Sequence, residues 1–235
     1  MKIDKTNAFR YLFEILVIVF SVTISFYIQE VLDDKEKEEL KNDSLRGMLD
    51  DLDDTESAFG TANIYFNERI AKAEKIIETK KVTSEDILWI KNGWDWYVTN
   101  TSYQSLIATG AAEYINNEGL YKEIVSFYNQ NSLLGFSKEY TAEAVNFKNY
   151  LTKNYKVKSM ITAEQYYNQR DWPTEIFNDY DDNSLNRMVL DDVFNNYIYN
   201  LKKYNVGMLF WLRLSQEKLL KLRESIKKEI KPSNN

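Results

Sequence analysis

The chain has 235 residues, 30 Lys and Arg against 36 Asp and Glu, a net charge of -6, and neither His nor Cys. Without His or Cys, the chain cannot use His-based acid–base catalysis, a Ser-His-Asp triad, a thiol nucleophile, or a zinc or haem site built on these side chains. The pI near 5.0 argues against a nucleic-acid-binding face, which needs clustered Lys and Arg. The 7 Gly and 2 Pro leave few helix breakers, so the composition favours long helices with short connections.

Residues 11–28 are almost entirely apolar, with the sequence YLFEILVIVFSVTISFYI, and Glu14 is their only formal charge. A bilayer core requires about 20 apolar residues at about 1.5 Å of rise each, and Ala8 and Phe9 extend the segment to that length. A cleaved signal peptide would need a small-residue cleavage site after Ile28, which the sequence lacks. Residues 1–30 are therefore predicted to be an N-terminal tail and a retained transmembrane anchor.

Polar residues within this anchor are candidates for function inside the membrane: Arg10, Glu14, Ser21 and Ser25. Glu14 follows Arg10 by one helical turn, so the simplest interpretation is a snorkelling carboxylate paired with Arg10 or with a neighbouring chain. The alternative is a proton- or ion-coupled role. Ser21 and Ser25 form a small-xxx-small stripe that would let two spans approach closely, and their hydroxyls can bond back to their own helix.

The flanks of the anchor predict its orientation. Lys2, Lys5 and Arg10 precede it, whereas acidic side chains dominate residues 30–39. Because Lys and Arg favour the cytoplasmic side, we expect a cytoplasmic N-terminus and a periplasmic helical domain on a bacterial inner membrane. The alternative is a cytoplasmic domain whose basic C-terminal end touches lipid headgroups.

Residues 31–82 are predicted to be a stalk that continues into a long helix, because apolar residues recur every three or four positions from Leu45 to Ile77. Gly47 and Gly60 are candidate bends. Residues 83–182 are predicted to be a distal region of short helices, with caps at Thr83, Thr101 and Asn117 and an irregular stretch after Tyr155.

Residues 183–235 are predicted to be a long C-terminal helix and tail, with helix from about Ser184 to Ile230. Its apolar stripe is Leu201, Met208, Leu212, Ser215, Leu219, Leu222 and Ile226. Two long helices at opposite ends of a chain should pack antiparallel. This would set the basic residues Lys221, Arg223, Lys227, Lys228 and Lys231 beside the acidic residues 33–39. The expected fold is all-α: a single transmembrane helix continuing into an elongated antiparallel helical bundle.

Residues 100–130 have the sequence NTSYQSLIATGAAEYINNEGLYKEIVSFYNQ. They resemble a segment of an uncharacterised bacterial family of single-span membrane proteins, at Tyr103, Leu106, Gly110, Ile115, Asn117, Leu120, Ile124 and Tyr128. That family also begins with one span preceded by an aromatic residue and a Glu-Ile pair, as at Phe13, Glu14 and Ile15. The resemblance covers about the first 130 residues and departs from the family at Tyr27 to Val31. The family is a domain of unknown function, so the resemblance implies an architecture and no activity.

Three further groups of residues are candidates for catalysis, metal binding or ligand contact. Ser215 with Lys218 and Ser225 with Lys228 match S-x-x-K, but companion motifs are missing, so a solvated helix face is the simpler interpretation. Asp179, Asp181, Asp182 and Asn183 could hold calcium or, more simply, cap the following helix. Neither a metal site nor a cofactor is predicted.

The third group is aromatic: Trp94, Trp96, Tyr97 and Trp172 are a candidate distal contact surface, with filling of the distal core as the alternative. The sequence thus favours a non-catalytic, membrane-anchored interaction or scaffold protein. Its expected partners are the lipid bilayer and either further copies of itself or another membrane protein, without nucleic acid. The alternatives are a membrane-bound sensor or effector with a distal ligand-binding domain, and an enzyme using the carboxylates of residues 179–183.

Overall fold

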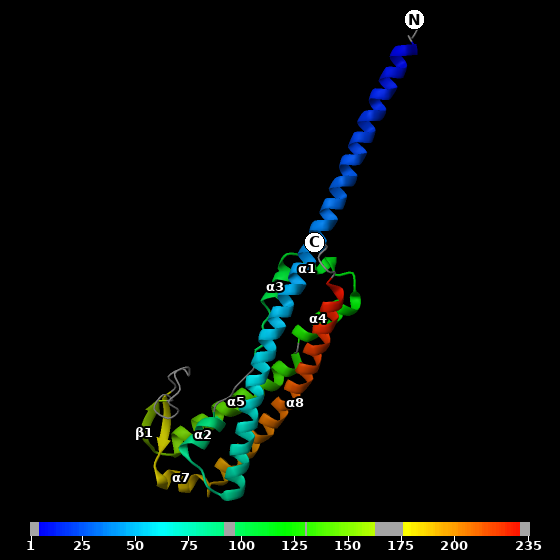
Figure 1. The fold of residues 1–235 in the computed structure, drawn as a ribbon. Helices are drawn as coiled ribbons and strands as arrows, with labels where there is room; N and C mark the ends of the chain where they lie inside the picture. The colour runs from blue at the N-terminus through cyan, green and yellow to red at the C-terminus, as the bar shows by residue number, and fades with distance from the viewer. Residues whose placement is uncertain (1–4, 92–96, 130, 163–175, 231–235) are drawn as a thin grey trace.

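The computed structural model describes residues 5–91, 97–129, 131–162 and 176–230, which form a long rod with one end much thinner than the other (Figure 1). The elements in chain order are α1 (Lys5–Thr79), α2 (Ser84–Lys91), α3 (Thr101–Ala108), the 3-10 helix η1 (Ala111–Tyr114), α4 (Glu118–Tyr128), α5 (Asn131–Asn154), β1 (Val157–Thr162), β2 (Ile176–Tyr180), α7 (Asp182–Met188) and α8 (Asp192–Glu229). The described part of the chain is therefore mostly helical, with one small sheet.

Helix α1 is continuous over 75 residues, a length of about 110 Å at 1.5 Å per residue. Neither Gly47 nor Gly60 interrupts it. Every side chain from residue 13 to residue 37 is exposed, whereas from Lys41 onward buried positions recur every three or four residues. The predicted continuous rod is confirmed: one end of α1 stands alone and the other forms part of the bundle.

Helix α8 packs antiparallel to α1 along the thicker part of the rod (Figure 1). Near the N-terminal end of α8, Lys202 Nζ lies 2.9 Å from Glu74 Oε1. Near its C-terminal end, Arg223 Nη2 lies 2.7 Å from Asp53 Oδ1. The predicted stripe of α8 is confirmed, because all seven of its residues are buried: Leu201, Met208, Leu212, Ser215, Leu219, Leu222 and Ile226.

The charge pairing that the sequence predicted between the end of α8 and residues 33–39 is wrong in register. Lys227 pairs with Glu224 of its own helix, and Arg223 reaches Asp53 and Glu56 of α1. At the end of α8 it is an acidic residue, Glu229, that lies 3.6 Å from Lys41. Packing of the buried stripes sets this register, since exposed ion pairs are individually too weak to do so.

The single helix predicted from Ser184 is divided into α7 and α8. Asp191 begins α8 by accepting hydrogen bonds from the backbone N–H of Val193 and Phe194, at 2.8 and 3.3 Å. The same carboxylate accepts hydrogen bonds from the hydroxyls of Tyr150 and Tyr155 at the end of α5. These contacts hold the chain in a turn at residues 189–191, because Asp191 satisfies the helix N-terminus and two tyrosines at once.

The region predicted to be distal, residues 83–182, is divided between the two ends of the bundle. The segment from α3 to α4 returns to the end nearest the exposed part of α1: Ser102 N donates to Asp51 at 2.6 Å, and Asn117 Nδ2 donates to Glu229 at 3.2 Å. Gly47 permits this approach, since a Cβ there would lie 2.7 Å from Ser102 Oγ. At the far end lie α2, the two strands and α7, together with the C-terminal end of α5, where Tyr150 and Tyr155 meet Asp191 (Figure 1).

The expectation of an all-α fold needs one correction, an antiparallel pair of strands in the stretch that showed no regular pattern. β1 and β2 pair with Met160 opposite Asn178. Ser84 of α2 holds the sheet in place: its Oγ donates to Asp179 at 2.8 Å and accepts from Tyr180 N at 2.9 Å. Neither strand alternates strictly between apolar and polar residues, as VKSMIT and IFNDY show, so the period-2 pattern that marks a strand in a sequence is missing from both.

Packing at two glycines generates a stability prediction. A Cβ on Gly207 of α8 would lie 2.3 Å from Cζ of Phe136, whereas a Cβ on Gly60 of α1 would meet nothing within 4 Å. We expect Gly207→Ala to destabilise the protein by about 1–3 kcal/mol, because the Phe136 ring must leave its position. Gly60→Ala, the control, should be neutral or stabilising by up to about 1 kcal/mol, because Ala favours helix.

Thermal unfolding of the detergent-solubilised chain, followed by circular dichroism, measures both changes. A Gly207→Ala protein that unfolds at the wild-type temperature or above would contradict the packing described here.

Candidate functional site

The exposed N-terminal part of α1 carries the polar residues that the sequence singled out. The hydroxyls of Ser21 and Ser25 donate to the carbonyls of Val17 and Ser21, both at 2.8 Å, so they are satisfied within their own helix as predicted. Glu14 lies on the same exposed surface. Arg10 belongs to α1, but its side chain lies outside the described residues, so the Arg10–Glu14 pair stays a prediction.

Small side chains give this surface an open hollow, which Ser21, Val22, Ser25, Phe26 and Gln29 line. The hollow exists because two small serines, one turn apart, lie beside the larger Val22 and Phe26. A surface of this kind can receive the side chains of a second helix at close range. Within the described residues, α1 is the one helix long and apolar enough to cross a membrane.

The predicted aromatic contact surface is largely outside the described residues, since Trp94, Trp96 and Trp172 all fall there. Tyr97 is described and its side chain is 65% exposed. It does not lie at the far end of the bundle: two residues later, Thr99 N donates to Thr55 Oγ1 at 3.0 Å, which places this segment beside the middle of α1.

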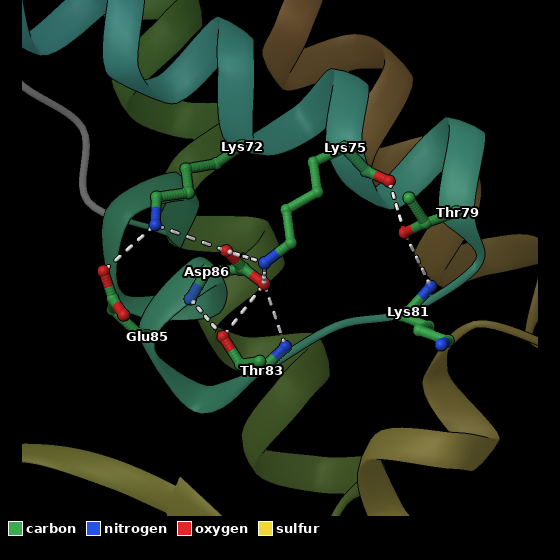
Figure 2. A network of polar contacts seen from close by, with 7 residues as sticks. All are labelled: Lys72, Lys75, Thr79, Lys81, Thr83, Glu85 and Asp86. Carbon is green, nitrogen blue, oxygen red and sulfur yellow. Dashed lines mark hydrogen bonds and ion pairs between the residues drawn. The ribbon is translucent and has the colours of Figure 1, made fainter.

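A polar network joins α1 to α2 at the far end of the bundle, and Figure 2 shows it at close range. Its centre is Asp86, whose side chain is fully buried. Asp86 Oδ2 accepts from Thr83 N at 3.0 Å, and Thr83 Oγ1 accepts from Asp86 N at 3.1 Å. The two residues thus form a capping box, which confirms the cap predicted at Thr83.

Two lysines of α1 complete this network, and no pattern in the sequence pointed to them. Lys75 Nζ donates to Asp86 at 2.9 Å, while Lys72 Nζ lies 3.0 Å from Glu85 and 3.5 Å from Asp86. Burial alone would raise the pKa of the Asp86 carboxyl, but the hydrogen bonds from Lys75 and Thr83 outweigh it and lower the pKa. The network therefore locks the turn between the two helices, and all its groups are engaged in holding the fold.

A second buried polar group lies in the middle of the bundle. Arg69 is 3% exposed, and its Nη1 donates at 2.8 Å to the hydroxyl of Tyr140, which in turn donates to Asn205 Oδ1 at 3.1 Å. Burial lowers the pKa of Arg69, and Tyr140 opposes this only in part. No carboxylate of the described residues forms an ion pair with Arg69, and its Nε has no hydrogen-bond partner there. Sequence patterning gave no signal for this site, because Arg69 occupies an ordinary position of the α1 stripe.

The acidic residues weighed as a calcium site serve other purposes. Asp181 caps α7 by accepting from Ser184 N at 2.7 Å, as the simpler interpretation predicted. Asp179 accepts from Ser84 Oγ of α2 and so ties β2 to that helix. The residues that the structure describes contain no group of three or more His, Cys, Asp or Glu side chains that could hold a metal.

The S-x-x-K motif at Ser215 was interpreted as part of a solvated face, and for Ser215 this is wrong. Ser215 is 1% exposed and belongs to the core, while Lys218 is exposed. The two side chains therefore point in different directions, as residues three apart at the edge of a buried stripe do.

No family model, curated protein or solved structure matches this chain. The resemblance of residues 100–130 to an uncharacterised membrane-protein family therefore stays a prediction.

The capping network generates a pH-dependent prediction. Since the pKa of folded Asp86 lies below its ordinary value of 3.8, the carboxylate stabilises the fold above that pH and loses this effect as the pH falls below it. We expect Asp86→Asn to lower the free energy of unfolding at pH 7 by about 1–3 kcal/mol, because charged hydrogen bonds to Lys75 and Thr83 become neutral ones. The difference from wild type should shrink at pH 3.

Urea unfolding at both pH values measures this effect. Glu85→Gln is the matched control: Glu85 makes one partly exposed ion pair, so its loss should cost less than about 1 kcal/mol. Equal effects of the two substitutions at pH 7 would show that Asp86 is not the centre of the network.

Proposed function

We propose that this protein is a single-pass, membrane-anchored helical scaffold or interaction protein that self-associates and has no catalytic activity. Its N-terminus lies in the cytoplasm and its helical domain in the periplasm, on a bacterial inner membrane. One observation carries the proposal: the first part of α1 exposes apolar side chains on every side and is continuous with a helix of the folded bundle.

This exposure is the strongest argument for the bilayer. Large apolar residues from Phe13 to Leu32 are 42–69% exposed, and none of them packs on the bundle. Contiguous apolar surface of this extent marks a membrane or protein interface. A helix suits the bilayer because its backbone groups are satisfied internally, and here the serine hydroxyls are too.

The segment between the span and the bundle gives the scaffold its geometry. Residues 29–40 form about 18 Å of helix between the span and Lys41, and Lys37 Nζ already lies 5.9 Å from the ring centre of Tyr114 in η1. Their acidic residues outnumber the two lysines, Lys35 and Lys37, so anionic headgroups would repel the segment rather than bind it. In this arrangement the bundle stands clear of the bilayer as a rigid extension of the anchor.

A role without catalysis is supported by how the described carboxylates are used. Asp86, Asp181 and Asp191 cap helices, and Asp51 accepts a backbone N–H from α3. These four carboxylates hold the fold, so they are not free to act as general acids or bases. The alternative function is a sensor with a ligand-binding surface. Among the predicted aromatic contact residues that the structure describes, Tyr97 supports it, because its ring is exposed.

Self-association through the span is testable on its serine hollow. We expect the change of both Ser21 and Ser25 to Leu to weaken association in detergent or bilayers by about tenfold, which is about 1.4 kcal/mol, because the larger side chains keep two helices apart. Thr23→Leu is the matched control, since Thr23 has the same back-bonded hydroxyl on the opposite side of the helix.

Native mass spectrometry or energy transfer between labelled copies measures this association. A wild-type chain that stays monomeric at membrane-like concentrations would contradict the scaffold proposal. A ligand retained by that monomer would favour the alternative function, a membrane-bound sensor.

The orientation is testable because the chain has no Cys. Ser57→Cys places one thiol at an exposed position of the bundle. We expect a membrane-impermeant thiol reagent to label it in intact spheroplasts, while Asn7→Cys, ahead of the span, reacts only after permeabilisation. The reverse pattern would place the domain in the cytoplasm.

A further inference from the structure

Two series of buried side chains give α1 and α8 an unbroken heptad pattern. On α1 the series runs from Lys41 to Ile76 in alternate steps of four and three residues, and every side chain in it is buried. On α8 a series with the same steps runs from Phe194 to Ile226, and it too is buried throughout. These are the steps of a coiled-coil seam, in which two helices pack along matching stripes.

A pattern that repeats every seven residues does not by itself select one register. The ion pairs Lys202–Glu74 and Arg223–Asp53 enclose equal numbers of residues on α8 and α1, and they define the observed register. Sliding α8 along α1 by seven residues, about 10 Å, would again set one buried series against the other. The ion pairs would be lost, but partly exposed pairs are individually weak. Discrimination between the registers therefore requires a buried interaction.

Polar side chains of both series meet at one height in the middle of the bundle. Arg69 belongs to the α1 series and Asn205 to the α8 series, and they are 3% and 1% exposed. Counting inward from the ion pairs puts Asn205 level with residue 71, only about 3 Å along the rod from Arg69. The hydroxyl of Tyr140, from α5, accepts from Arg69 Nη1 at 2.8 Å and donates to Asn205 Oδ1 at 3.1 Å. We call these three side chains the polar layer.

Sliding by one heptad in either direction would break the polar layer. Asn205 would come to lie at least about 7 Å along the rod from Arg69, too far for one hydroxyl to bond both side chains. If α5 stayed with α1, Asn205 would lose Tyr140, and if α5 moved with α8, Arg69 would lose it. A buried polar group without its partner is costly, so both shifted registers are disfavoured.

We propose that the polar layer selects the observed register of α8 on α1 from those one heptad away. Its composition suits this role better than a stabilising one. No carboxylate of the described residues forms an ion pair with Arg69, and its Nε has no hydrogen-bond partner there. Buried polar groups of this kind reduce stability relative to apolar side chains, yet they make one alignment of a heptad seam better than the others.

Contacts between α5 and α8 leave this task to Arg69. The close fit of Phe136 against Gly207 joins α5 to α8, and so does the hydrogen bond from Tyr150 to Asp191. Both contacts would survive if α5 and α8 slid together along α1. Arg69 opposes that movement because it is the member of the polar layer that α1 contributes.

The register determines how far α8 reaches toward the apolar end of α1. In the observed register Glu229, the last residue of α8, lies 3.6 Å from Lys41. A slip of seven residues would carry this end about 10 Å along α1, either over residues 34–40 or away from Lys41. The polar layer thus sets the distance between the near end of the bundle and the span, whether or not the chain self-associates.

The stability of an apolar layer is the first test. Arg69→Met, Tyr140→Phe and Asn205→Leu together replace every polar side chain of the layer by an apolar one of similar size. We expect the full chain with all three changes, in detergent, to unfold at or above the wild-type temperature. Tyr140→Phe alone should lower that temperature by about 3–8 °C, because it leaves Arg69 and Asn205 buried without their bridge. A triple variant that fails to fold, or unfolds below wild type, would show that the layer serves stability and would overturn the proposal.

The distance between two spin labels measures the register directly, because the chain has no Cys of its own. Ser57→Cys on α1 and Tyr199→Cys on α8 are at exposed positions about 30 Å apart along the rod. Double electron–electron resonance is recorded with the labelled chain diluted in unlabelled chain, so that distances between copies do not contribute. We expect one distance with the polar layer intact. The triple variant should add a second population, at least one fifth of the molecules, displaced by up to about 10 Å.

Met208→Leu is the matched control for this measurement. Met208 is a buried member of the α8 series one turn from Asn205, and its replacement keeps the polar layer, so the single distance should remain. A triple variant that folds and also keeps the single distance would show that the apolar side chains suffice to set the register, which overturns the proposal.

Discussion

The whole molecule is organised around the unbroken hydrogen-bonded backbone of α1. Because 75 residues form one helix, the direction of every side chain in the apolar part is fixed relative to the bundle. A bilayer that orients the apolar end of this helix therefore also orients the bundle. The bundle needs only one further long helix, α8, to bury the other end of α1, and the remaining elements cover a single side of that pair.

The two ends of the bundle are closed by different interactions. At the far end, the Thr83–Asp86 capping box and two lysines lock the turn after α1, where Lys80 takes a left-handed backbone conformation with φ of 49°. At the near end, the buried Lys41 pairs with Glu229 at 3.6 Å, and Asn117 donates to the same carboxylate, so these residues join α1, α4 and α8. Each end thus buries one charged group, Asp86 at the far end and Lys41 at the near end. In its middle the bundle holds Arg69 without a carboxylate partner among the described residues, a costly arrangement that the Tyr140–Asn205 hydrogen bonds offset only in part.

Predictions from the sequence were most accurate for helices in which apolar residues recur every three or four positions. The stripe from Leu201 to Ile226, the continuity of α1 and the cap at Thr83 were all visible, because each depends on neighbours within a few residues. These predictions failed where a contact between distant residues decided the outcome. The hydrogen bonds from Tyr150 and Tyr155 to Asp191 divide α7 from α8, and the fit of Ser102 against Gly47 brings α3 back to the near end. Neither contact leaves a local signature.

The amino-acid sequence alone establishes one apolar segment of membrane-spanning length, the lack of His and Cys chemistry, and two long amphipathic helices. These properties follow from composition and from periodicity along one helix. The register of α8 on α1, the small sheet docked on Ser84 and the burial of Arg69 depend instead on contacts between distant elements. The physical reason is that close packing of side chains between distant elements chooses among registers that local periodicity leaves equivalent.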